Sequence, residues 1–133
     1  MSLFPQAPNA VVMICPHHFY PNAQTAQDNS FQANAPMDKT KVQTMAYNQV
    51  TVASKLLEAE GVIVHTFADE GHETPDSVFP NNCFSTHTGG QIAIYPMYAQ
   101  NRRMERRQDI IELLKKQYRV QDVVDYSGLE YDE

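Results

Sequence analysis

The sequence lacks features that define two common classes of protein. It has no tryptophan and only two cysteines, Cys15 and Cys83, among 133 residues. Two thiols are too few for the disulfide framework of a small secreted domain. Apolar runs such as Val11–Cys15 are far shorter than the roughly 20 residues that span a bilayer. A disulfide-rich scaffold and a membrane-spanning protein are therefore not expected.

Positive charge is also scarce. Ten Lys and Arg against 16 Asp and Glu give a formal net charge of −6. Phosphate binding needs a net basic face, so we expect no nucleic-acid partner. The chain opens without the basic stretch and apolar block of a signal peptide, which together with two thiols indicates the cytoplasm. Residues 1–8 are expected to be disordered or a remnant of an expression vector.

The first half of the chain, residues 9–68, has the pattern of a strand, a helix and a second strand. Asp38 is a suitable N-cap and Gly61 a suitable C′ residue, so a helix is predicted between them. Strands are predicted on either side, at 9–15 and 62–67. The helix carries a stripe that we expect to face a core, made of Val42, Met45, Ala46, Gln49, Val50, Ala53, Leu56 and Leu57.

A long polar segment, residues 16–37, separates the first strand from the helix. Its asparagine, glutamine and serine side chains cannot supply a buried face. Loops longer than about 12–15 residues inside compact domains are usually functional or disordered. We expect this segment to form a lid over a binding site.

The second half, about residues 76–126, repeats the strand and helix patterns. Its predicted elements are a strand at 78–87, a turn at 88–90, a strand at 91–95, a helix at 102–117 capped by Asn101, and a strand at 120–124. Two similar ββαβ-like units in a row favour an α/β fold that is part of a repeat architecture.

The segment Asp76–Asn82 is the first candidate for a binding site. It places one carboxylate and two amides, Asn81 and Asn82, around the apolar Phe79 at the start of a predicted strand. A flat ligand with many N–H groups, such as guanidinium or urea, needs several acceptors at fixed spacing. The alternative interpretation is a polar turn that leads into a strand.

A cluster of arginines, within Asn101–Arg107, is the second candidate. It puts four arginines in the first turns of a predicted helix, where the helix dipole disfavours exposed cations by about 0.3–1 kcal/mol each. Helix N-termini favour anions, so Arg102 or Arg103 could hold a substrate carboxylate. The alternative is a solvated basic face that Glu105 partly neutralises.

These segments together resemble the amidinotransferase and arginine deiminase superfamily, the penteins. The resemblance covers roughly residues 10–133 and is carried by the blocks 22–32, Pro75–His87, Ile94–Met97 and Asn101–Arg107. It is nearest to the bacterial citrulline- and arginine-handling hydrolases. Dimethylarginine dimethylaminohydrolase is a more distant relative, which shares a related Asp-Ser-Val-Phe segment and a paired-arginine segment.

The resemblance implies a propeller of five ββαβ modules, of which this chain would supply about two. It implies attack of a cysteine thiolate on a guanidinium carbon, assisted by a histidine and carboxylates, with transfer to water or to an amine. The partner would be a small guanidino or ureido compound, with no cofactor and no metal. The substrate contacts carried over by position are Asp76, Phe79, Asn81, Asn82, Arg102 and Arg103.

Three departures from the family pattern are visible. Distant relatives carry a carboxylate where Asn82 stands, and an amide would suit a ureido oxygen better than a full cation. Relatives usually carry tryptophan at Cys83 and often arginine at Cys15. Neither cysteine corresponds to the family nucleophile, so we expect the catalytic residues beyond residue 133 and an inactive chain on its own.

Three rival interpretations remain. Cys83 and His87 on one strand would lie about 13 Å apart, too far for a nucleophile and its base, so a buried structural cysteine is expected. No zinc-site spacing joins the cysteines and histidines, which are Cys15, His17, His18, His65, His72 and Cys83. A non-catalytic module that binds a ligand or partner would expose helix faces and sheet edges, which predicts a homo-oligomer.

Overall fold

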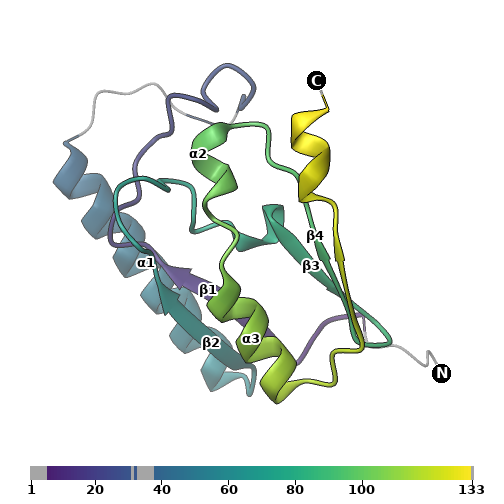
Figure 1. Cartoon of the computed structure of the whole chain (residues 1–133). Coiled ribbons are helices and arrows are strands. Elements are labelled where there is room, and N and C mark those ends of the chain that lie inside the picture. The colour runs from purple at the N-terminus through teal and green to yellow at the C-terminus, as the bar shows by residue number, and fades with distance from the viewer. Residues whose placement is uncertain (1–5, 31, 33–37, 133) are drawn as a thin grey trace. The chain divides into compact units, whose positions relative to one another are not determined.

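The computed structural model describes residues 6–30, 32 and 38–132. The chain divides into two compact units, Met1–Phe79 and Pro80–Glu133, which are described separately below. Each unit is a mixture of helix and a small sheet, as Figure 1 shows, so the predicted α/β class is confirmed.

The first unit is a βαβ arrangement. Strand β1 (Ala10–Cys15) pairs in parallel with β2 (Ile63–Ala68), with Val12 opposite His65 in the register. Parallel neighbours need a crossover connection, which helix α1 (Lys39–Ala59) supplies. Figure 1 shows α1 running along the two strands, and it contacts both of them.

The predicted ends of α1 are confirmed. The Asp38 carboxylate accepts a hydrogen bond from the backbone N–H of Thr40 at 2.9 Å, which satisfies one of the unpaired donors of the first turn. Gly61 has φ +84° just after the C-cap, a left-handed conformation that glycine adopts without strain.

The predicted core stripe of α1 is wrong in part. Val42 is buried, whereas Met45 is 44% exposed and Leu56 is 64% exposed. The physical reason is the width of the surface beneath the helix. Two strands cover only one side of a helix, so a stripe of eight positions is too broad to be buried there.

The second unit holds a three-stranded mixed sheet in the order β3-β4-β5. Strands β3 (Phe84–His87) and β4 (Gln91–Ile94) form the predicted hairpin, and β5 (Asp122–Asp125) pairs in parallel with β4. The connection between β4 and β5 contains the short helix α2 (Gln100–Arg103) and helix α3 (Gln108–Gln117).

Helix α3 covers one face of this sheet (Figure 1) and forms the core of the second unit with it. The buried members of this core include Cys83, Ile92, Ile110, Ile111 and Leu114. Ile92 is only 1% exposed.

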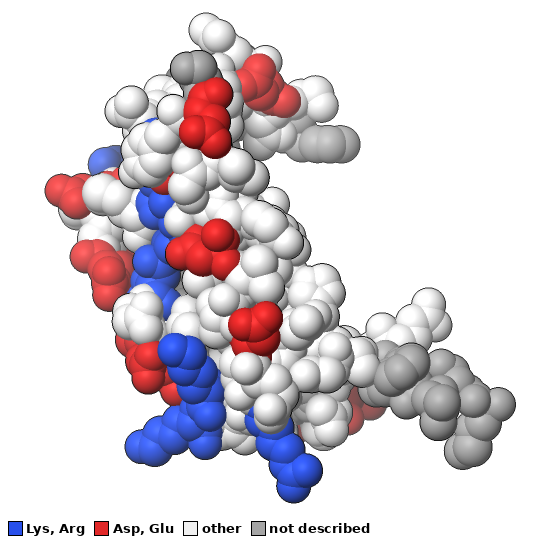
Figure 2. Space-filling model, turned by 45° about the vertical axis from the view of Figure 1, so that its right-hand side comes forward, with Lys and Arg blue, Asp and Glu red and all other residues white. Residues whose placement is uncertain are grey.

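Within the described residues, no helix combines the length and apolar character needed to cross a membrane. Figure 2 shows basic side chains next to acidic ones on the face that it presents.

Several element boundaries of the second unit differ from the prediction. The last strand begins at Asp122 rather than at residue 120, and Asn101, the predicted cap, lies inside α2. The strand expected at 78–87 begins only at Phe84, because a 3₁₀ turn at Pro80–Asn82 precedes it and the N–H of Cys83 donates to the Pro80 carbonyl at 3.1 Å. The helix expected at 102–117 is interrupted between Arg103 and Gln108. The interruption lets neighbouring arginines reach different acidic partners, as described below.

The turn between β3 and β4 supports a prediction about Gly90. Its φ is +79°, and a Cβ built on it would collide with the carbonyl oxygen of Arg119. Gly90→Ala should therefore destabilise the protein by roughly 2–4 kcal/mol, from backbone strain and the collision together. Gly89→Ala is the matched control, since Gly89 has φ +90° and open space around it. Equal unfolding free energies of the two variants in urea would contradict the role assigned to the Arg119 contact.

Candidate functional site

In the first unit, Asp76 is held in place by the polar segment that follows β1. The Asn22 side-chain amide donates to Asp76 Oδ2 at 2.9 Å, and the Thr25 hydroxyl lies 3.4 Å from the same oxygen. These contacts join residues more than 50 positions apart in the sequence. The carboxylate of Asp76 is therefore restricted in its rotation by a second segment of the chain.

Asn22 is the centre of that segment. Its side chain accepts from the Gln24 N–H at 3.0 Å, and its backbone carbonyl accepts from the Thr25 N–H and from the Gln32 side chain, both at 3.2 Å. Asn22 is only 3% exposed. The expectation that residues 16–37 supply no buried side chain is thus wrong, because an asparagine whose amide and carbonyl are satisfied can be buried. Residues 31 and 33–37 of the predicted lid lie outside the described residues.

An aromatic surface adjoins Asp76. The Phe79 N–H donates to the Asp76 carbonyl at 3.0 Å, in a turn that brings the two residues together. The Phe19 and Phe79 rings lie edge to face, with centroids 6.4 Å apart. Phe79 remains 46% exposed. A carboxylate and a partly exposed phenyl ring therefore occur side by side in the turn.

The start of the polar segment is anchored at the end of β2. The His18 N–H donates to Asp69 Oδ2 at 2.7 Å, and His18 Nδ1 lies 3.0 Å from Asp69 Oδ1. His72 packs edge to face against the His18 ring, with centroids 4.3 Å apart. Among the described residues, no group of three or more His, Cys, Asp or Glu side chains could hold a metal ion.

In the second unit, Arg102 joins two residues that the sequence singled out. Its Nε and Nη2 donate to the Glu105 carboxylate at 3.0 and 2.9 Å, and Nη2 also donates to Asn82 Oδ1 at 3.2 Å. The Glu105 side chain is 1% exposed. Two of the predicted site residues, Asn82 and Arg102, are therefore in direct contact.

Glu130 is a second buried carboxylate, which accepts from several groups. Both of its oxygens accept from the Arg106 guanidinium at 2.7 Å, and Oε2 also accepts from the Met97 N–H at 3.1 Å. Arg103 Nε lies 3.8 Å from Oε2. The hydrogen bond from Arg106 is the main reason that the pKa of Glu130 is lowered. The glutamate therefore stays ionised although its side chain is 2% exposed.

The remaining arginines also have partners within the unit. Arg103 Nε donates to the Met97 carbonyl at 2.9 Å, and its guanidinium lies over the Tyr131 ring at 5.6 Å. Arg107 donates to the Asp109 carboxylate at 2.6 Å. The arginines are thus neither in the first turns of a long helix nor a freely solvated face. Glu130 was missed in the sequence, where it is one of several acidic residues near residue 130.

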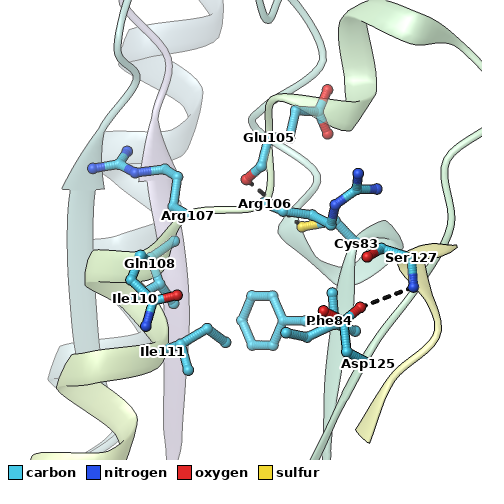
Figure 3. A pocket seen from close by; sticks show the side chains of 11 residues that line it. Cys83, Phe84, Glu105, Arg106, Arg107, Gln108, Ile110, Ile111, Asp125 and Ser127 are labelled. Atoms are coloured by element: carbon cyan, nitrogen blue, oxygen red, sulfur yellow. Dashed lines mark hydrogen bonds between the residues drawn. The ribbon is translucent and has the colours of Figure 1, made fainter. Parts of the chain in front are cut away.

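A small cavity of about 140 Å³ lies beside Cys83. Figure 3 shows Phe84 and Ile111 directed toward it, with the Cys83 sulfur close to the backbone of Glu105. Cys83 is 3% exposed, and its thiol donates to the Pro80 carbonyl at 3.3 Å. Burial is the main cause that raises the pKa of Cys83 to about 11. The expectation of a buried structural cysteine is confirmed, and both cysteines are free thiols.

The raised pKa of Cys83 leads to a prediction about stability at alkaline pH. The folded protein keeps a proton on this thiol that the unfolded chain releases above pH 9.0, so the stabilising contribution is complete below pH 9 and is lost by about pH 11. The total loss should be roughly 2–3 kcal/mol. We expect Cys83→Ala to lose less stability than the wild type between pH 8 and pH 11 in urea unfolding. Cys15→Ala is the comparison: the pKa of this less buried thiol is also raised, but by less, so this variant should keep more of the wild-type pH dependence than Cys83→Ala does; identical curves for all three proteins would contradict the assignment.

The predicted site residues fall in both units. Asp76 and Phe79 belong to the first unit, and Asn81, Asn82, Arg102 and Arg103 belong to the second. Asn81 is exposed on the 3₁₀ turn that precedes β3. Each group is organised by hydrogen bonds within its own unit: the first unit offers a carboxylate and an aromatic ring, and the second offers amides and guanidinium groups.

A carboxylate beside an exposed phenyl ring and amides oriented by arginine suit proteins that bind flat, nitrogen-rich head groups. The family model described as N,N dimethylarginine dimethylhydrolase, eukaryotic, matches residues 15–133, and the chain belongs to this family. The family is part of the pentein superfamily and hydrolyses a guanidino compound. No curated protein and no solved structure matches the chain.

The match confirms the predicted superfamily and corrects its predicted branch. The bacterial citrulline and arginine hydrolases, expected to be nearest, are not supported, whereas the family expected to be more distant is the one that matches. The error has a simple origin. The two groups share related forms of the Asp76–Phe79 segment and of the paired arginines, so these blocks alone do not separate them.

Proposed function

We propose that this chain supplies substrate-binding residues for the hydrolysis of an Nω-methylated arginine, with Asp76 and Phe79 as head-group contacts. The observation that carries the proposal is the placement of Asp76, whose Oδ2 is fixed by Asn22 and Thr25 inside a region that matches the family. A carboxylate is the natural acceptor for guanidinium N–H groups. Because its rotation is already restricted, less entropy is lost when a ligand binds.

Phe79 would recognise the methyl groups of the substrate. Methylation removes N–H donors from the guanidinium and adds apolar surface, which favours contact with an aromatic ring over contact with water. A cation close to the ring face gains a further amount of about 0.5–1 kcal/mol at an exposed site. The gain is about 2 kcal/mol when the cation is desolvated. The edge-to-face contact with Phe19 supports the Phe79 ring in its partly exposed position.

In the second unit, Asn82, with Asn81 beside it, is a separate candidate for contact with a ureido or guanidino group. Arg102 donates to Asn82 Oδ1, which leaves the amide N–H groups directed away from Arg102. An outward N–H donor suits a ureido oxygen better than a guanidinium, which has only donors. Hydrolysis converts a guanidino group into a ureido group, so Asn82 would bind the ureido product more favourably than the guanidino substrate.

Arg103 is the better candidate for the substrate carboxylate. Arg102 is matched by Glu105 at 2.9 Å, which gives a neutral pair. Arg103 and Arg106 instead share one carboxylate, Glu130, and Arg103 is the more distant of the two at 3.8 Å. Arg103 is therefore less fully paired with a carboxylate than Arg102 is, and its guanidinium could bind an anionic ligand.

The nucleophile of the reaction would come from elsewhere in the protein. Cys83 is buried and has a pKa of about 11, so it holds almost no thiolate at neutral pH. The pKa of Cys15 is also raised, mainly by burial and then by the nearby Asp69. In this proposal the two units are modules of a pentein propeller, residues 16–37 act as a lid, and the thiolate and histidine lie outside these 133 residues.

The contribution of Phe79 can be tested by calorimetric titration of the whole chain. We expect wild-type protein to bind Nω,Nω-dimethylarginine more tightly than arginine, and Phe79→Ala to lose most of this preference, by about 3- to 30-fold. Tyr98→Ala is the control, because Tyr98 is a 76% exposed aromatic residue outside the proposed site. A preference that persists in Phe79→Ala would refute the aromatic contact.

A further inference from the structure

A hydrogen-bonded group of side chains lies on the hairpin of the second unit, apart from the arginines. Ser85 Oγ is 2.7 Å from His87 Nε2 and 2.6 Å from the Tyr95 hydroxyl. Ser85 and His87 are two positions apart on β3, so their side chains point to the same face of the sheet. Phe84 and Ile94 point to the other face, where they line the cavity beside α3.

We infer that Ser85 is a nucleophile activated by His87, able to take an acyl group from an activated ester. A serine hydroxyl is a weak nucleophile unless an adjacent base removes its proton. The 2.7 Å contact puts the base within the distance needed for that transfer. This reactivity is separate from the binding of methylarginine, since it involves none of the residues proposed for that site.

Tyr95 completes a chain of hydrogen bonds through Ser85. With a neutral imidazole, Nε2 can only accept from Ser85 when Nδ1 carries the proton. Ser85 then donates its single proton to His87 and accepts from the Tyr95 hydroxyl. The Tyr95 ring is itself held by stacking on Tyr126, with an interplanar angle of 11°. In the tautomer that carries its proton on Nδ1, the serine proton is directed at the base before a ligand arrives.

Access to the group is also favourable. His87 is exposed and Ser85 is partly exposed, so a small electrophile can approach from solvent. Tyr95 is also partly exposed at the neighbouring strand. The pair lies next to the Thr88–Gly90 turn, at the end of β3, where β4 is its hydrogen-bonded neighbour (Figure 1).

The reaction balances without a cofactor. Ser85 Oγ forms a bond to the carbonyl carbon of an aryl ester while its proton moves to His87 Nε2. The tetrahedral intermediate then expels the aryl oxide, the imidazolium releases its proton to water, and acyl-Ser85 remains. A fluorophosphonate reacts in the same way, with formation of an Oγ–P bond and loss of fluoride. Both leaving groups depart without protonation, which defines the substrate class as activated esters.

The test is covalent labelling of the whole chain with a fluorophosphonate, quantified at each serine by peptide mass spectrometry. We expect Ser85 to be labelled well above the exposed Ser30. His87→Ala should lower the rate at Ser85 by about 100-fold, the low end of the range for one general base. Added imidazole should restore part of the rate, because it can occupy the space left by an exposed side chain.

Controls separate base catalysis from a structural effect. Thr86→Ala changes the adjacent residue on the opposite face of β3 and should label like the wild type, and circular dichroism checks that each variant is folded. Labelling of Ser85 at the level of Ser30, or undiminished labelling in His87→Ala, would overturn the inference. A folded His87→Ala protein that loses labelling and is not rescued by imidazole would also overturn it, since His87 would then act only as a structural partner.

Discussion

Glu130→Gln is expected to lower the unfolding free energy by about 2–4 kcal/mol. Removing one member of a buried ion pair typically costs 3–5 kcal/mol because the other charge stays buried without compensation. The Arg106 side chain is 20% exposed, which places the expected loss in the lower part of that range. Glutamine keeps the shape of the side chain, so the loss reports on the charge and on the paired hydrogen bonds from Arg106.

The control for this substitution is Glu112→Gln. Glu112 is also an acidic residue paired with a cation, Lys115 at 3.4 Å, but its side chain is 59% exposed. Exposed pairs contribute about 0–1 kcal/mol, so the control should be nearly neutral in urea unfolding.

The contribution of Glu130 to stability should also depend on pH. Because the pKa of Glu130 is lowered by Arg106, this contribution is present above the unfolded-state pKa and is lost as pH falls through the folded-state value.

A double variant makes the test of Glu130 sharper. Glu130→Gln combined with Arg106→Gln removes both charges, so the second substitution should cost less than it does alone. If Glu130→Gln destabilises the protein no more than Glu112→Gln does, the pair with Arg106 does not stabilise the second unit. Additive effects of the two substitutions would lead to the same conclusion.

Asp76→Asn is expected to weaken binding of Nω,Nω-dimethylarginine by about 10- to 100-fold. Hydrogen bonds to charged groups contribute about 1.5–3 kcal/mol, which corresponds to this range of dissociation constants. The amide keeps the size of the side chain and removes the charge that attracts the guanidinium. Asn22→Ala should weaken binding less, because it removes a group that holds Asp76 in place and leaves the carboxylate itself.

Asp28→Asn is a matched control for the binding measurement. Asp28 is an exposed carboxylate in the same polar segment and is not proposed to contact the substrate. The affinities are best measured by calorimetric titration at fixed salt concentration, since screening weakens interactions between exposed charges. Equal affinities of the wild type and Asp76→Asn would remove Asp76 from the binding site.

The ends of α1 could be predicted from the sequence because they depend on neighbouring residues. Asp38 caps the helix through Thr40, two positions away, and Gly61 adopts its left-handed conformation beside the last turn. The hairpin turn near Gly90 was predictable for the same reason. Contacts over short sequence distances are encoded in short patterns, which a single sequence contains in full.

The interruption of the predicted helix between Arg103 and Gln108 could not be predicted in this way. Arg106, which lies inside the interruption, donates to both oxygens of Glu130, 24 positions later in the sequence. Helical spacing alone favours one continuous helix over this region. A contact between residues so far apart in the sequence leaves no trace in the helical periodicity.

The candidate site was likewise predictable only in the features that depend on residues close together in the sequence. The segment that contains Asp76 and Phe79 was found because its residue types and its resemblance to a family are local features. The contact of Asp76 with Asn22 spans 54 positions and was not foreseen. The predicted anion site at the arginines relied on the first turns of one long helix, whereas Arg102 and Arg103 lie in the four-residue helix α2, so the choice of Arg103 now depends on its shared carboxylate instead.

The most direct test of the proposed function uses the Asn22 side-chain amide as a reporter in ¹H–¹⁵N spectra of the whole chain. Its N–H group donates to Asp76 Oδ2, so a guanidinium that binds Asp76 must change its resonances. We predict a saturable shift of the Asn22 amide on titration with Nω,Nω-dimethylarginine, and no such shift in Asp76→Asn. Saturable binding that leaves the Asn22 resonances unchanged in the wild type would contradict the placement of the head group at Asp76.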